Sequence, residues 1–278
     1  MDPVIRDISD TARWAATFRA QETERPDALF HDPFAARLAG ERGAEIVAKV
    51  PHAADHAWAW VMRTYLFDRV IRSRIEAGAT TVLNLAAGLD ARPYRMELPP
   101  DLHWVEVDLP ELVAYKDQVL AGERPRCRLE RVVMDLADTA ARRALFQRLG
   151  TGLVICEGLL IYFSEEQVAE LARDLAGAGF DYWLFDLASP GLLQMLQATT
   201  GRSTAQAGAP LRFAPKERTG FFEPFGWKAM EVHPVFEAAL ATGRFPKEML
   251  ASPPALPPGI ESEIWSGACL LERFAGGG

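Results

Sequence analysis

The sequence predicts an α/β protein with a largely parallel sheet, and three observations lead to that fold class. From Thr80 onward, short apolar, β-branched runs alternate with mixed polar segments of helix length, a pattern typical of parallel sheets with right-handed crossovers. The runs are nearly all apolar, which indicates strands buried on both faces. Hydrophobic residues make up 49% of the 278 residues and charged residues 24%, which excludes a disordered chain or a coiled coil.

Residues 1–79 are expected to form an N-terminal helical cap. The segment 9–25 opens with Ser9 or Asp10 as an N-cap, and 27–38 holds one short helix broken at Pro33. Apolar residues then recur at helical intervals through 53–77, which predicts a longer third helix.

Residues 80–188 are expected to form the α/β core. Strands are predicted at 80–88, 102–110, 127–136, 152–160 and 180–188, and helices at 109–121, 139–149 and 165–176. Gly, Ser, Thr and Gln clusters at 189–210 indicate a mobile insertion, and with a helix at 215–222 it makes up a lid, residues 189–225. Residues 226–278 complete the sheet with strands at 227–232 and 262–275.

Charge and cysteine content exclude several classes of protein. Thirty Lys and Arg against 38 Asp and Glu give a formal net charge of −8, the reverse of the basic surplus usual in nucleic-acid binders. The three cysteines form no C-x-x-C pair, which disfavours zinc and disulfides. Without a signal-like start or an apolar run of roughly 18 residues, we expect a soluble, cytoplasmic protein with no membrane partner.

Carboxylates follow the predicted strands at their carboxyl ends, where ligands bind in open parallel sheets. Asp90 follows the first predicted strand, and Asp108, Asp135 and Glu157 lie at the ends of the next three. The first loop has one glycine, Gly88, and lacks the G-x-G-x-x-G of a dinucleotide site. An acidic rim repels phosphates and suits a positively charged nucleoside such as S-adenosylmethionine.

Four motifs in this order and spacing resemble the leucine carboxyl methyltransferase family: NLAAGLDARPYR, VEVDLPE, VVMDL and ICEGLLIYFSEEQV. They are most similar to its bacterial branch of polyketide-synthesis, tetracenomycin-type O-methyltransferases, and the likeness covers about residues 9–188. The resemblance implies the class I methyltransferase fold, a seven-stranded Rossmann-like sheet whose last strand is antiparallel. It also implies S-adenosyl-L-methionine as the cofactor.

The resemblance implies a role for each matching residue. It assigns Arg63 to the cofactor's methionine carboxylate, Gly88 to close approach beside it, and Asp108 to the ribose hydroxyls. It assigns Asp135 and Leu136 to the adenine and Glu157 to the methionine amine. This sequence departs from the family's G-A-G-L-D-T-R in two places: Ala86 suits the loop only with a negative φ, and Ala91 lacks a capping hydroxyl.

Structural roles remain open for several of these residues. Asp108 and Asp135 are each also suited to capping the helix that follows. Asp90 is suited equally to cofactor binding and to capping through Arg92, and Arg63 also fits a solvated helix face. His52 and His56 stand one helical turn apart, but no third ligand lies nearby in the sequence, so we expect no metal site.

The reaction expected is methyl transfer to a carboxylate or phenolic oxygen of a small molecule. A carboxylate needs no general base, whereas a phenol does, and His31, His52, His56 and His233 are the histidine candidates. Tyr162 is expected to border the acceptor. One alternative is a non-catalytic S-adenosylmethionine-binding regulatory protein on the same fold. A nicotinamide dehydrogenase is disfavoured by the missing glycines, and the oligomeric state is unspecified.

Overall fold

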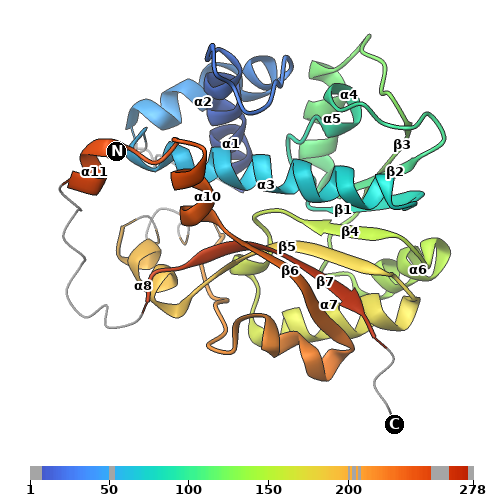
Figure 1. Ribbon diagram of the computed structural model, residues 1–278. Coiled ribbons are helices and arrows are strands. Elements are labelled where there is room, and N and C mark those ends of the chain that lie inside the picture. Colours follow the sequence, from blue (N-terminus) through green and yellow to red (C-terminus); the bar gives the residue numbers. More distant parts are fainter. Residues whose placement is uncertain are drawn as a thin grey trace.

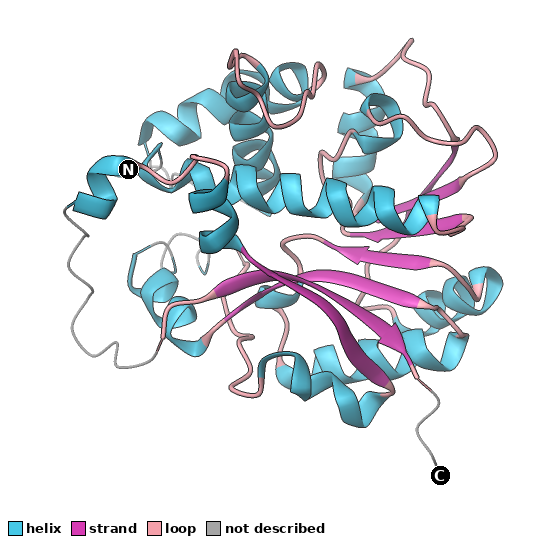
Figure 2. Cartoon of the chain, in the orientation of Figure 1, coloured by secondary structure: helices cyan, strands magenta, loops and turns pink. Residues whose placement is uncertain are grey.

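The computed structural model describes residues 8–49, 54–199, 201, 205, 208–251 and 263–274. A seven-stranded sheet lies between two layers of helices (Figures 1 and 2). The strands are β1 (Thr81–Leu85), β2 (His103–Asp108), β3 (Arg128–Val133), β4 (Leu153–Cys156), β5 (Tyr182–Ala188), β6 (Trp227–Pro234) and β7 (Ser266–Arg273).

The strand order is β3-β2-β1-β4-β5-β7-β6. The first five strands pair in parallel, and β7 runs antiparallel to both of its neighbours, β5 and β6. This mixed sheet confirms the predicted fold class with its antiparallel last strand. Because the parallel strands all end on one side, the residues that follow them gather along one edge of the sheet.

The helices fall on both sides of the sheet and around its carboxyl edge (Figure 1). They are α1 (Ile8–Thr23), α2 (Ala35–Lys49), η1 (Ala54–His56), α3 (Ala57–Glu76), α4 (Arg92–Arg95), α5 (Pro110–Val119), α6 (Thr139–Leu149), η2 (Leu160–Tyr162), α7 (Glu165–Ala178), α8 (Pro190–Thr199), η3 (Arg218–Phe225), α10 (Val235–Ala241) and α11 (Lys247–Ala251). Across these ranges, no helix is long and apolar enough to cross a membrane.

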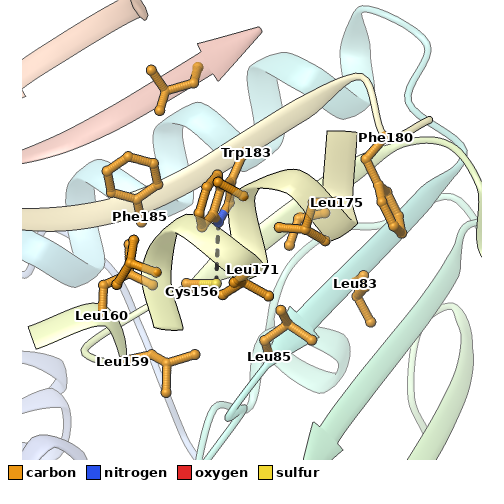
Figure 3. Close-up of a cluster of buried hydrophobic side chains, with 14 of the residues drawn as sticks. Leu83, Leu85, Cys156, Leu159, Leu160, Leu171, Leu175, Phe180, Trp183 and Phe185 are labelled. Atoms are coloured by element: carbon orange, nitrogen blue, oxygen red, sulfur yellow. Dashed lines mark hydrogen bonds between the residues drawn. The ribbon is translucent and has the colours of Figure 1, made fainter. Parts of the chain in front are cut away.

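Successive side chains of each strand point to opposite faces of the sheet, so the strands contribute to two separate hydrophobic cores. One face packs against α6 and α7, and Figure 3 shows its buried cluster, where the Trp183 indole N–H donates to Cys156 Sγ at 3.2 Å. The other face packs against α3 and α10, with Trp104 and Leu184 fully buried. The central strands are thus covered on both faces, as predicted, whereas the edge strand β3 is half-exposed.

Three expected elements differ in the structure. The short helix expected within 27–38 is instead α2, which begins after Pro33 and runs to Lys49 with a break at Gly40. The glycines at 40 and 43 weaken the sequence pattern of a helix. A Cβ at Gly43 would lie 2.5 Å from Thr17 Oγ1, so a larger residue at this position would clash with α1. Glycine therefore allows α1 and α2 to pack closely. The helix expected at 215–222 is the 3₁₀ helix η3.

The segment 189–210, expected to be irregular, begins with the helix α8. The Ser189 hydroxyl accepts the Leu192 N–H at 3.2 Å, and Pro190 occupies the first helical position. Both features favour a helix start, and they outweigh the polar composition of the residues that follow.

Candidate active site

A cavity of about 1870 Å³ opens at the carboxyl edge of the sheet. Every residue predicted to bind the cofactor lines it, although these residues come from separate parts of the chain. They are Arg63, Gly88, Asp90, Asp108, Asp135, Leu136 and Glu157, and the acceptor-side candidate Tyr162 lines the cavity as well. The fold therefore brings the whole predicted set into one volume.

Asp108 closes the loop after β1. Its Oδ2 accepts the Gly88 N–H at 2.5 Å and its Oδ1 accepts the Leu109 N–H at 2.8 Å. The N-cap of α5 is Leu109, so Asp108 does not cap that helix. Burial raises the pKa of Asp108, and its two backbone N–H donors only partly oppose that effect. A buried carboxylate with lone pairs to spare is suited to accept further hydrogen bonds from hydroxyls.

The backbone of this loop is strained at Ala86. Gly88 has φ +51°, which glycine tolerates, but Ala86 has φ +52°. The expectation of a negative φ at Ala86 is therefore wrong. A left-handed alanine costs roughly 1–2 kcal/mol, and the strain is stored directly beside Asp108 and the cavity.

Asp135 is an exposed residue on the cavity wall, next to the buried Leu136. Its Oδ1 accepts the Ala137 N–H at 2.9 Å. The N-cap of α6 is Asp138, whose side chain accepts the Ala141 N–H. Asp138 therefore caps α6 in place of Asp135.

Arg63 and Glu157, assigned to opposite ends of one amino acid, contact each other. Arg63 Nε donates to Glu157 Oε1 at 3.1 Å, and Nη1 donates to Asp186 Oδ2 at 3.3 Å. Only 17% of the Arg63 side chain is exposed, so it does not lie on a solvated face. A Cβ at Gly158, whose φ is +68°, would lie 3.1 Å from Arg63 Nη1. Glycine at this position therefore gives the guanidinium its room.

Asp90 makes the contacts of a helix start. Its Oδ1 accepts the Arg92 N–H at 2.8 Å, and its Oδ2 accepts from the Asn84 amide and from Arg92 Nη1. Burial raises the pKa of Asp90, but the positive charges of Arg92, Lys116 and Arg95 and the Arg92 N–H together outweigh burial and lower the pKa to about 2. Both oxygens are therefore engaged by the protein, although the side chain borders the cavity.

A chain of ion pairs runs from α1 to the strand ends, and we call it the buried charge chain. Its members in order of contact are Arg19, Asp32, Arg95, Asp68, Arg92, Glu157, Arg63 and Asp186, with Asp90 attached to Arg92. Four arginines meet five carboxylates, so the chain carries one excess negative charge. Such a site attracts a ligand with a net positive charge.

Asp186 lies near the carboxyl end of β5 and was not among the predicted residues. Its Oδ1 accepts the Gly158 N–H at 2.5 Å while its Oδ2 accepts from Arg63. The run FDYWLFDLA carries a carboxylate near its end, as three of the other four strand runs do, and the first run is followed by Asp90. The same strand-end rule would have identified Asp186.

The general-base candidates do not all reach the cavity. His56 lines it, whereas His31 does not and His233 is paired with Glu231 at 2.9 Å. His52 lies outside the described residues. Burial raises the pKa of Tyr162, which hydrogen-bonds Thr11. Within the described ranges, no three His, Cys, Asp or Glu residues are grouped to hold a metal ion.

The sheet with an antiparallel β7 between β5 and β6, and the carboxylate-lined cavity at its edge, define a class I S-adenosylmethionine-dependent methyltransferase fold. A crystal structure of a "putative methyltransferase" from Thermobifida fusca shares this fold, with a TM-score of 0.59 and 19% identity over 99% of this chain and 97% of that one. The family model of leucine carboxyl methyltransferase matches residues 12–176, and the chain belongs to that family.

Two curated relatives are named "putative S-adenosyl-L-methionine-dependent methyltransferase". The protein from Frankia alni is 31% identical over 84% of this chain and 87% of its own length. The protein from Parafrankia sp. is 36% identical over 60% of this chain, and the match spans 58% of that relative's length.

Proposed function

We propose that the chain is an S-adenosylmethionine-dependent O-methyltransferase that acts on a carboxylate or phenolic oxygen of a small molecule, with polyketide-type metabolites as the expected acceptors. S-adenosylmethionine is the cofactor. The observation that supports the reaction is the single cavity in which Asp108, Asp135, Arg63 and Glu157 converge from four segments. Its volume exceeds the roughly 300–1,000 Å³ usual for one ligand, so it offers room for a cofactor and an acceptor together.

The residues present fit this cofactor chemically. Asp108 offers a buried acceptor to ribose hydroxyls, and Asp135 has an oxygen left to accept from the adenine amino group. The guanidinium of Arg63 is suited to bind the carboxylate of the cofactor's amino acid, and the carboxylate of Glu157 is suited to bind its ammonium. The sulfonium of S-adenosylmethionine supplies an activated methyl group. The ammonium and carboxylate of its amino acid cancel each other in charge, so the sulfonium gives the cofactor a net charge of +1. The excess negative charge of the buried charge chain matches that net charge.

Activation of the acceptor depends on its oxygen. A carboxylate is already ionised and requires only alignment and exclusion of water. A phenol requires a base, and His56 is the histidine candidate on the cavity wall within the described residues. Tyr162 has a raised pKa, so it stays protonated and is suited to donate a hydrogen bond. Residues of α1 and α8 border the cavity, which is consistent with lid roles for the N-terminal helices and residues 189–225.

Titration of the purified protein with S-adenosylhomocysteine, adenosine and NAD tests the proposal. Glu157→Gln and Arg63→Ala should each weaken S-adenosylhomocysteine by roughly 1.5–3 kcal/mol, the range for hydrogen bonds to charged groups, and leave adenosine nearly unchanged. Asp108→Ala should weaken both ligands. Methyl transfer to carboxylic and phenolic acceptors separates an enzyme from a binding protein. Binding of NAD without S-adenosylhomocysteine would overturn the proposal.

A further inference from the structure

The cavity continues beyond the carboxylate rim into a region with apolar walls, which we call the acceptor chamber. Six residues form the walls used in the argument below: Trp58, Leu192, Met195, Leu196, Phe236 and Phe245. They belong to α3, α8, α10 and the loop after α10. Figure 1 shows α8 and the pair α10 and α11 at the same side of the molecule, beyond the end of β5.

One wall is the apolar face of α8. Leu192, Met195 and Leu196 are spaced at i, i+3 and i+4, which places them on one face of a helix, and all three line the cavity. A stripe of this kind normally packs against the protein core. Here these residues are only half-buried, and Gly191 is the one buried residue of α8. The protein therefore leaves an apolar helix face turned toward the cavity.

The aromatic residues form another part of the wall. Phe245 lies between Trp58 and Phe236, with ring centroids 4.8 Å from each. Phe236 remains 46% exposed despite this packing, and two more cavity residues, Leu250 and Ile264, are 51% and 37% exposed. Large apolar side chains gathered at one opening indicate a surface that a ligand covers.

We propose that the acceptor carries a large apolar body, an extended chain or fused rings, that lies in the acceptor chamber while its acceptor oxygen points toward the cofactor-binding end of the cavity. This inference rests on the proposed function and specifies its substrate class. A small polar acceptor would leave α8 and the aromatic wall in contact with water. A long apolar one removes that surface from water, which is the main source of affinity in sites of this kind.

Saturated carboxylic acids of increasing length provide the test. Butyric, octanoic and dodecanoic acids are titrated calorimetrically into the protein loaded with S-adenosylhomocysteine, and anthracene-2-carboxylic acid tests the fused-ring shape. Dodecanoic acid has eight more methylenes than butyric acid, and each buried methylene is worth about fourfold in affinity. Burial of only half of them predicts roughly a 250-fold gain, so dodecanoic acid should bind at least about 100-fold more tightly than butyric acid. Tight binding of the anthracene acid alone would assign the ring shape.

Two glutamate variants of α8 form a matched pair. Met195→Glu places a charge in the chamber and should weaken dodecanoic acid at least tenfold while S-adenosylhomocysteine binds as before. Gln194→Glu adds the same charge at an exposed position that does not line the cavity, and it should change neither ligand. If Met195→Glu does not fold, Leu196→Ala replaces it and should weaken dodecanoic acid several-fold.

The outcomes separate the two proposals. If S-adenosylhomocysteine binds but neither dodecanoic acid nor the anthracene acid binds more tightly than butyric acid, the large apolar acceptor is wrong and the proposed function stands. If Met195→Glu and Gln194→Glu weaken the binding of dodecanoic acid equally, the assignment of the acceptor chamber is also wrong. If the native protein does not bind S-adenosylhomocysteine, the proposed function itself fails.

Discussion

Asp186→Asn tests whether the strand-end carboxylate of β5 positions Arg63 for the cofactor. The substitution keeps the size of the side chain and one oxygen acceptor, but it removes the charge that faces Arg63 Nη1 at 3.3 Å. If the remaining oxygen keeps the Gly158 N–H, the new amide group faces the guanidinium, donor against donor. Of the two carboxylates to which Arg63 donates, only Glu157 then remains. We therefore expect the Arg63 side chain to be held less firmly in its present orientation.

The magnitude follows from one lost charge-assisted hydrogen bond. The exposed fractions of the two side chains are 17% for Arg63 and 23% for Asp186, so water replaces the contact only in part. The low end of the range for such bonds, about 1.5 kcal/mol, corresponds to roughly a tenfold loss of S-adenosylhomocysteine affinity. Adenosine has no amino-acid end, so its affinity should stay within about twofold. Isothermal titration calorimetry with both ligands measures the difference.

Asp181→Asn is the matched control, because Asp181 makes similar contacts at the other end of β5. It accepts the Gly152 N–H at 2.8 Å and the Thr151 hydroxyl at 2.7 Å, and it does not line the cavity. Both variants should lower the melting temperature by a few degrees, since a loss of about 1 kcal/mol corresponds to roughly 2–4 °C in a chain of this size. Equal weakening of adenosine and S-adenosylhomocysteine in the Asp186 variant would refute the positioning role.

Three further predictions concern the loop, its carboxylate and the thiols. Ala86→Gly should stabilise the protein by up to about 1 kcal/mol, because relief of the positive φ at residue 86 exceeds the entropy cost of glycine; an unchanged or lower melting temperature would contradict the strain. The raised pKa of Asp108 means that ionising it costs stability at neutral pH, and that S-adenosylhomocysteine affinity should fall as the pH drops through that pKa; Asp108→Asn should remove most of this pH dependence. Burial raises the pKa of Cys156 and Cys269 to about 12 and that of Cys127 to about 11, so a thiol reagent at pH 7.5 should label none of the three until denaturant is added.

The strand ends could be predicted because their signal is local. An apolar β-branched run that stops at a carboxylate specifies both the end of the strand and the chemistry placed there, as at Asp108 and Glu157. All parallel strands end on one side, so their convergence follows without long-range information. Gly88 could be predicted for the same reason, since the tight turn after β1 falls within a few residues of the strand.

Contacts between distant residues could not be predicted in this way. Arg63 and Glu157 are 94 residues apart, and no periodicity indicates that α3 carries Arg63 to the end of β4. The positive φ of Ala86 depends on how the loop closes against Asp108, which alanine's own preference opposes. The full length of α2 was not predicted, because a glycine such as Gly43 disfavours a helix in the sequence. Its role is to make room for Thr17 of α1, and that contact is visible only in the structure. Tertiary packing decided each of these cases.

The position of β7 between β5 and the edge strand β6 has a consequence for the order in which the sheet is completed during synthesis. The edge strand β6 pairs with β7, which follows it in the chain after residues 235–265, and β5 also needs β7 as its second neighbour. Until β7 leaves the ribosome, β5 has an unpaired edge and β6 has no place in the sheet. The nascent chain therefore exposes the unpaired, apolar edge of β5 for longest, and self-association or chaperone binding is favoured there.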